Sequence, residues 1–120
     1  MDRHPTMSMT TWIVAAVIGT ALWYYLFRFG KVSPAEAHQR VEAGARLIDV
    51  RTPEEFEGGH IPGAVNIPLS VIRSDAASVG PTDAEYVLCC ASGARSASAA
   101  RILKAAGREN VYDLGSIGRW

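Results

Sequence analysis

This chain has no net charge and very little cysteine. Its 12 basic and 12 acidic residues cancel, which disfavours a nucleic-acid-binding protein, because such proteins typically carry a basic excess or a basic stripe. Its 2 cysteines, Cys89 and Cys90, are too few for a disulfide framework, and a bridge between adjacent residues is strained. With 120 residues, 48% of them apolar, the sequence predicts one folded domain and excludes a disordered chain.

Charge is also missing from the N-terminal part of the chain, where no Asp, Glu, Lys or Arg occurs between Pro5 and Phe27. The apolar run over residues 12–27 is interrupted only by Gly19 and Thr20. As a helix this run reaches about 24 Å, and the two preceding threonines extend it to about 27 Å, close to a hydrocarbon core of roughly 30 Å. We therefore interpret residues 1–9 as a tail and residues 10–29 as a single transmembrane helix.

Two other interpretations of the apolar run fit the sequence less well. A cleaved signal peptide has small residues just after its apolar core, whereas this run ends in bulky Leu, Trp, Tyr and Phe side chains. A core helix that is apolar all round would be poorly covered by a small partner domain. Arg3 precedes the run and Arg28 and Lys31 follow it, a bias that predicts a single-pass protein of the inner cell membrane with its folded domain in the cytoplasm. Free cysteines suit that reducing compartment.

Residues 31–120 are the expected folded domain, because helix and strand signals alternate along them. Ser33-Pro34 and Thr52-Pro53 each combine a capping side chain with proline at the first helical position. A third helix is expected at residues 94–106, strands at residues 47–50, 86–89 and 111–114, and an extended segment at residues 61–68. In the third helix the inward-facing residues are predicted to be Ala99, Leu103 and Ala106. This alternation predicts an α/β fold with a parallel sheet and helices on its faces.

The chemistry is expected at the carboxyl end of the strand over residues 86–89, where Cys90 begins the loop that leads into the third helix. Backbone N–H groups of such a loop form an anion cradle, and the helix N-terminus adds positive potential. Both effects favour the thiolate, which is the nucleophile. Gly93 gives the loop conformational freedom. Arg95 either supplies a cationic donor to the anion or only caps and pairs locally. Cys89, inside the strand, is expected to be a small buried hydrophobic residue, which is also the alternative interpretation of Cys90.

Four segments together carry a family resemblance: 47–56 (LIDVRTPEEF), 59–68 (GHIPGAVNIP), 90–96 (CASGARS) and 111–117 (VYDLGSI). The chain from about Lys31 to Trp120 resembles a single-domain rhodanese, a sulfurtransferase. The resemblance implies a five-stranded parallel sheet with helices on both faces. It also implies that Cys90 takes sulfane sulfur from a donor such as thiosulfate, becomes a persulfide, and passes the sulfur to a thiol or cyanide, with neither metal nor organic cofactor. The implied persulfide cradle consists of Ala91, Ser92, Gly93, Ala94 and Arg95.

Other polar residues are assigned supporting roles. Asp49 and Arg51 are expected to form a structural ion pair, and the resemblance places them near the site. His60 is expected to fix its turn through a hydrogen bond, with a role as a base as the alternative. Trp120 is expected to pack on the edge of the core. The glutamates at 54, 55 and 57 are expected to form a solvated helix face. Two adjacent cysteines and scattered histidines do not supply the three or four ligands that a metal site needs.

The main functional hypothesis is a membrane-anchored sulfurtransferase, and three alternatives stay open. A cysteine phosphatase is disfavoured because four residues separate Cys90 from Arg95, one fewer than in a phosphate-sized loop. A non-catalytic adaptor that docks a membrane protein is suggested by Ala91, where active relatives often carry a polar residue, and by a chain that stops at Trp120. A redox sensor built on Cys89 and Cys90 is disfavoured by their adjacency.

Overall fold

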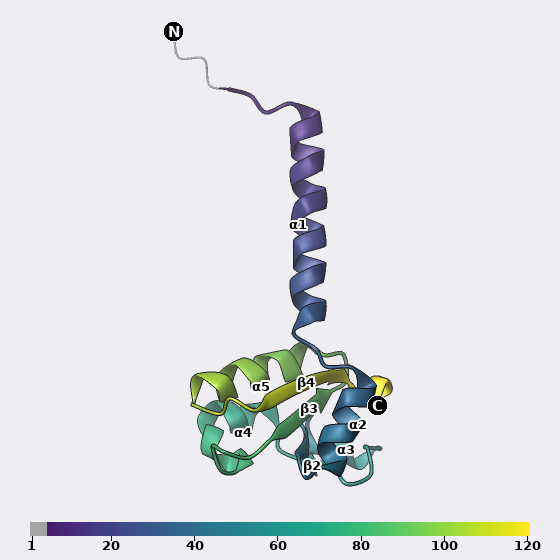
Figure 1. The fold of residues 1–120 in the computed structure, drawn as a ribbon, viewed down its shortest axis with the longest axis vertical. Helices are drawn as coiled ribbons and strands as arrows, with labels where there is room; N and C mark the ends of the chain where they lie inside the picture. The colour runs from purple at the N-terminus through teal and green to yellow at the C-terminus, as the bar shows by residue number, and fades with distance from the viewer. Residues whose placement is uncertain (1–4) are drawn as a thin grey trace. The chain divides into compact units, whose positions relative to one another are not determined.

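The computed structural model describes residues 5–120, except for the side chains of residues 26–29. The chain divides into two compact units, Met1–Gly30 and Lys31–Trp120, and each is described by itself. In the first unit a single helix, α1, runs over Met9–Phe29 (Figure 1). Its first turn is capped by Ser8, whose hydroxyl oxygen accepts a hydrogen bond from the backbone N–H of Thr11 at 3.3 Å.

The helix predicted at residues 10–29 is present, but the membrane span is not confirmed. Within the part of the chain that the structure describes, no helix is both long and apolar enough to cross a bilayer.

The second unit is built on a parallel sheet with the strand order β2-β1-β3-β4, in which every neighbouring pair is parallel. The strands are β1 (Arg46–Asp49), β2 (Val65–Asn66), β3 (Tyr86–Cys90) and β4 (Val111–Ser116). The described residues therefore form four strands where five were expected. Beyond β4 lies a single parallel bridge between Lys31 and Asp113, supported by a 2.9 Å hydrogen bond from the Val32 N–H to the Asp113 carbonyl. The extended segment stays this short because α2 begins at Pro34.

Helices cover both faces of the sheet and bury two separate cores (Figure 1). Besides the strands, the second unit contains α2 (Pro34–Glu42), α3 (Pro53–Glu57), α4 (Leu69–Ser74), α5 (Ala94–Ala105) and the short 3₁₀ helices Ala76–Val79 and Ile117–Arg119. On one face Leu88 packs with Ile72 of α4 and Leu103 of α5. On the other face Val87 packs with Ala37 of α2, and Trp120 lies partly buried at its edge. Successive residues of β3 thus enter different cores, as the alternation of a strand requires.

The helix starts follow their local sequence signals, with one incomplete cap. At α3, Thr52 and Glu55 form a complete capping box. At α2, Ser33 accepts a hydrogen bond from the Glu36 N–H at 3.1 Å, but the Glu36 carboxylate pairs with Arg40 of the same helix instead of completing the box. The prediction that Ala106 faces inward is wrong, because this residue is exposed. The reason is that α5 ends at Ala105, so residue 106 no longer continues the helical face.

Candidate active site

Cys90 is the last residue of β3 and lies at the carboxyl end of the sheet, opposite Ser116 of β4. The strand is one residue longer than predicted, so Cys90 is part of the ladder rather than the first loop residue. Its side chain is 0% exposed, although Ala91 and Ser92, which follow it, are exposed. Gly93, in the left-handed conformation with φ of 100°, is the N-cap residue that precedes α5. The short loop therefore leads directly from the thiol to a helix N-terminus.

The sulfur of Cys90 sits in a small hydrogen-bonded network. The backbone N–H of Gly93 donates to Sγ at 2.9 Å. The thiol donates to Oγ of Ser96 at 3.5 Å, and the Ser96 hydroxyl donates to the carbonyl of Gly93 at 3.1 Å. Among the described residues, Gly93 is the member of the predicted cradle whose amide bonds Sγ. Ser96 had no predicted role; its position on the first turn of the helix, one turn after Gly93, was the available signal.

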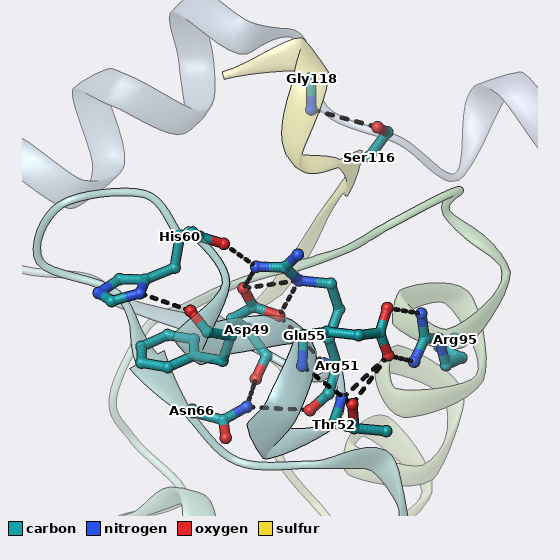
Figure 2. A network of polar contacts seen from close by, with 11 residues as sticks. Asp49, Arg51, Thr52, Glu55, His60, Asn66, Arg95, Ser116 and Gly118 are labelled. Atoms are coloured by element: carbon teal, nitrogen blue, oxygen red, sulfur yellow. Dashed lines mark hydrogen bonds and ion pairs between the residues drawn. The ribbon is translucent and has the colours of Figure 1, made fainter.

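Arg95 belongs to the predicted cradle, but its side chain is held on another helix. Its guanidinium makes two contacts with the carboxylate of Glu55 in α3, at 2.6 and 2.9 Å (Figure 2). The Arg95 hydrogen bond lowers the pKa of Glu55 to about 2, with help from Thr52. Glu55 is paired and partly exposed, whereas Glu54 and Glu57 are exposed, as expected for a solvated helix face. The Arg95 guanidinium is therefore committed to Glu55, and only the backbone N–H of Arg95 is left for the predicted cradle.

Asp49 and Arg51 form a buried ion pair at the end of β1. Nη2 of Arg51 lies 2.8 Å from Oδ2 of Asp49 and 2.7 Å from the Gly59 carbonyl, so the pair joins the end of β1 to the turn after α3 (Figure 2). The hydrogen bond to Asp49 raises the pKa of Arg51, although desolvation by burial opposes it. The Asn66 amide donates to the carbonyls of Asp49 and Arg51 at 3.1 and 2.9 Å. These contacts connect the end of β1 with the turn after α3 and with β2.

The side chain of His60 is turned toward α3. Its Nδ1 lies 2.8 Å from the Phe56 carbonyl, and its ring stacks on the Phe56 ring with centroids 3.7 Å apart (Figure 2). These contacts hold the turn that contains Gly59, the carbonyl partner of Arg51. The geometry agrees with a positioning role in the turn rather than with a base beside the sulfur.

Comparison with known proteins decides the family. The model of the rhodanese-like domain matches residues 33–120. The chain belongs to the rhodanese-like family. It is 40% identical over 101 residues to the Bacillus subtilis protein YqhL, covering 83% of this chain and 79% of that protein. It is 38% identical over 101 residues to thiosulfate sulfurtransferase 16, chloroplastic, of Arabidopsis thaliana, covering 74% and 84%.

The fold of the human single domain sulfurtransferase TSTD1 is also similar to that of this rhodanese-like chain. The two match with a TM-score of 0.60 at 29% sequence identity, over 75% of this chain and 90% of the human protein. The matched family region contains Cys90 and its loop, both strands beside it, and α5.

Cys89 of this rhodanese-like domain has the opposite environment to its neighbour. It is buried in the core beneath α2, with Ala37, Leu47 and Val87. Burial raises the pKa of the Cys89 thiol to about 12, and the nearby carboxylate of Asp49 contributes in the same direction. The thiol of Cys89 is therefore protonated at neutral pH and enclosed on the face away from α5.

Proposed function

We propose that this chain transfers sulfane sulfur from thiosulfate to a thiol or cyanide acceptor through a persulfide on Cys90. The observation that carries the proposal is the position of Sγ at the carboxyl end of β3, where the N–H of Gly93 donates to it at 2.9 Å. The family match and the sulfurtransferases among the relatives support a thiosulfate sulfurtransferase-like enzyme.

The reaction runs in two displacements at the terminal sulfur. The Cys90 thiolate attacks the outer sulfur of thiosulfate, its S–S bond breaks, and sulfite leaves with the electron pair. The product is a persulfide whose terminal sulfur carries the negative charge. A thiolate or cyanide then attacks that sulfur, forms a persulfide or thiocyanate, and returns the electron pair to Cys90. Each step moves negative charge within the loop, where backbone N–H groups and the N-terminus of α5 stabilise it.

The burial of Cys90 favours a small donor. Because its side chain is 0% exposed, a donor reaches Sγ only when part of the covering structure moves. Ala91 and Ser92 are the exposed residues next to it, and we propose that displacement of this short segment admits thiosulfate.

Intact mass spectrometry tests the proposal directly. After incubation with thiosulfate and removal of excess reagent, the parent protein is expected to gain the mass of one sulfur atom. The matched variant Cys89→Ala should gain the same mass, because that side chain lies on the other face of the sheet. Cys90→Ser should gain none and should produce no thiocyanate from thiosulfate and cyanide.

Two outcomes would contradict the proposal. An equal gain of sulfur in folded Cys90→Ser would show that another group accepts the sulfur. No gain in the folded parent protein would favour the non-catalytic docking function instead.

A further inference from the structure

Arg119 is the last residue of the 3₁₀ helix Ile117–Arg119, which follows β4 at the carboxyl end of the sheet. That helix begins directly after Ser116, the residue that lies opposite Cys90 in the sheet. The side chain of Arg119 turns back along the chain, because its Nη1 donates to the carbonyl oxygen of Leu114 in β4. The guanidinium group therefore lies beside the end of the strand that neighbours the proposed nucleophile.

The guanidinium of Arg119 and the loop after Cys90 both lie close to Gly115. A Cβ atom added to Gly115 would lie 3.6 Å from Nη1 of Arg119. A Cβ atom added to Gly93, whose N–H bonds the sulfur, would lie 3.6 Å from Cα of Gly115. Gly115 is therefore adjacent to both groups. Because the side chain of Arg119 is exposed, it can contact an anion that approaches the loop from solvent.

Arg119 differs from the other cations beside the loop in having no carboxylate partner among the described residues. Three paired cations lie near the loop, each with a carboxylate contact of 2.8 Å or less: Lys31 with Asp113, Arg51 with Asp49, and Arg95 with Glu55. Within the described part of the chain, Arg119 donates only through Nη1, to the Leu114 carbonyl. Its Nε and Nη2, which carry two parallel N–H groups, are therefore available to a ligand.

Thiosulfate brings two negative charges to a loop whose exposed side chains have none. The exposed residues that follow Cys90, which are Ala91, Ser92 and Ala94, carry no charge. The N–H of Gly93 is directed at Sγ, so it serves the transferred sulfur rather than the leaving group. In a displacement at the outer sulfur, sulfite leaves from the side of that sulfur opposite to the attacking Sγ. The sulfonate oxygens therefore need a donor outside the loop.

We propose that Arg119 binds the sulfonate group of thiosulfate while Cys90 attacks the outer sulfur, so that this site favours anionic sulfur donors over neutral ones. The inference rests on the proposed function, because it concerns the donor of that same reaction. A guanidinium edge with two parallel N–H groups matches two oxygens of such an anion and stays charged at every pH at which the thiolate forms. Arg119 binds the donor and the leaving sulfite, and it transfers no proton.

The first measurement is the rate at which the full chain gains sulfur mass as the thiosulfate concentration is varied. Arg119→Gln is expected to raise the half-saturating concentration about tenfold, because it removes a charge-assisted pair of hydrogen bonds from the bound anion. The maximal rate should stay within about twofold of the parent rate, since the guanidinium binds thiosulfate both before and during the displacement. Arg119→Lys keeps the charge but not the parallel N–H groups, so its half-saturating concentration should fall between the two.

The second measurement needs no sulfur donor. Iodoacetate and iodoacetamide alkylate the same thiolate of Cys90 but differ by one negative charge, so the ratio of their rates is independent of how much thiolate is present. In the Cys89→Ala background, Arg119→Gln is expected to lower the ratio of the iodoacetate rate to the iodoacetamide rate about threefold, and added salt should shrink this difference. Arg101→Gln, which removes the same charge from an exposed position of α5, is the matched control and should leave the ratio unchanged.

Circular dichroism and thermal unfolding identify the folded variants, and Arg119→Met replaces Arg119→Gln if the latter does not fold. An unchanged alkylation ratio in the folded variant would overturn the inference, and so would an equal fall in the ratio for Arg101→Gln. A lower maximal rate with an unchanged half-saturating concentration would also overturn it, because donor binding would then be intact. No mass gain in the folded parent would instead contradict the proposed function, a failure that the alkylation ratio does not share.

Discussion

At the scale of single residues, two consecutive cysteines of β3 acquire different chemistry from the direction in which they point. Cys89 enters the core beneath α2, while Cys90 enters the core beneath α4 and α5. Only the second direction leads to the N-terminus of α5 and the N–H of Gly93. The difference between the buried thiol of Cys89 and the proposed nucleophile Cys90 is thus a consequence of the period of two along a strand.

The thiol of Cys89 is expected to resist modification in the folded protein. In the Cys90→Ser variant at pH 8, iodoacetamide should label no thiol until denaturant is added, because burial raises the pKa of Cys89 to about 12 and excludes the reagent. Mass spectrometry of native and denatured samples measures the labelled fraction. Full labelling of the native variant would contradict the buried environment.

Replacing Gly115 by alanine is expected to lower the free energy of unfolding more than the same replacement at Gly107. Gly115→Ala and Gly107→Ala place alanine at nearly the same φ, 88° and 90°. The new Cβ would lie 2.8 Å from Cδ of Lys31 at Gly115, whereas nothing lies within 4 Å of it at Gly107. We expect about 1–2 kcal/mol for Gly107→Ala from backbone strain. Gly115→Ala should add about 1–3 kcal/mol from overpacking. Urea unfolding measures both, and equal costs would show that the stem of Lys31 moves freely.

At the scale of elements, Glu55 connects the start of α3 to the start of α5. Its Oε1 accepts from the N–H of Thr52 at 3.3 Å, which completes the capping box, and also from Arg95 at 2.6 Å. One carboxylate therefore serves a local cap and a contact between helices. The contact aligns the first turn of α5, whose preceding residue Gly93 bonds the sulfur.

The pair of Glu55 and Arg95 is expected to make stability depend on acid pH. The pKa of Glu55 is about 2 in the folded state against 4.5 ordinarily, so the unfolded chain takes up the proton first as pH falls. The stabilisation is complete above pH 4.5 and is lost as pH falls toward 2. Thermal midpoints of the parent should exceed those of Glu55→Gln at pH 6, with the difference shrinking below pH 4.5. Glu57→Gln, an exposed change on the same helix, should not show this convergence.

At the scale of the whole molecule, both cores lie within Lys31–Trp120. No buried residue of either core comes from the described part of Met1–Gly30, whose apolar side chains are exposed. A chain of residues 31–120 is therefore expected to unfold cooperatively, with a thermal midpoint close to that of the full chain, and to gain one sulfur from thiosulfate. Calorimetry and intact mass measure the two properties. Loss of cooperative unfolding on truncation would show that the first unit stabilises the second.

The helix starts, β3 and α5 follow from short-range signals that can be identified in the sequence. Pro34 and Thr52 mark helix starts because capping and proline geometry involve only neighbouring residues. The strand before Cys90 and the helix after it follow from local hydrophobic pattern and glycine. The position of the candidate nucleophile at a strand end was predictable for the same reason.

What the sequence by itself determined is the order of the elements, the family pattern and the choice of Cys90 as the candidate nucleophile, since each depends on residues close together in the chain. Only the tertiary structure decided which groups meet that cysteine and its loop. Arg95 meets Glu55 across 40 positions, and Lys31 meets Gly93 across 62 and Asp113 across 82. No local propensity encodes such pairs, because they form when the sheet brings distant backbone segments to the same edge.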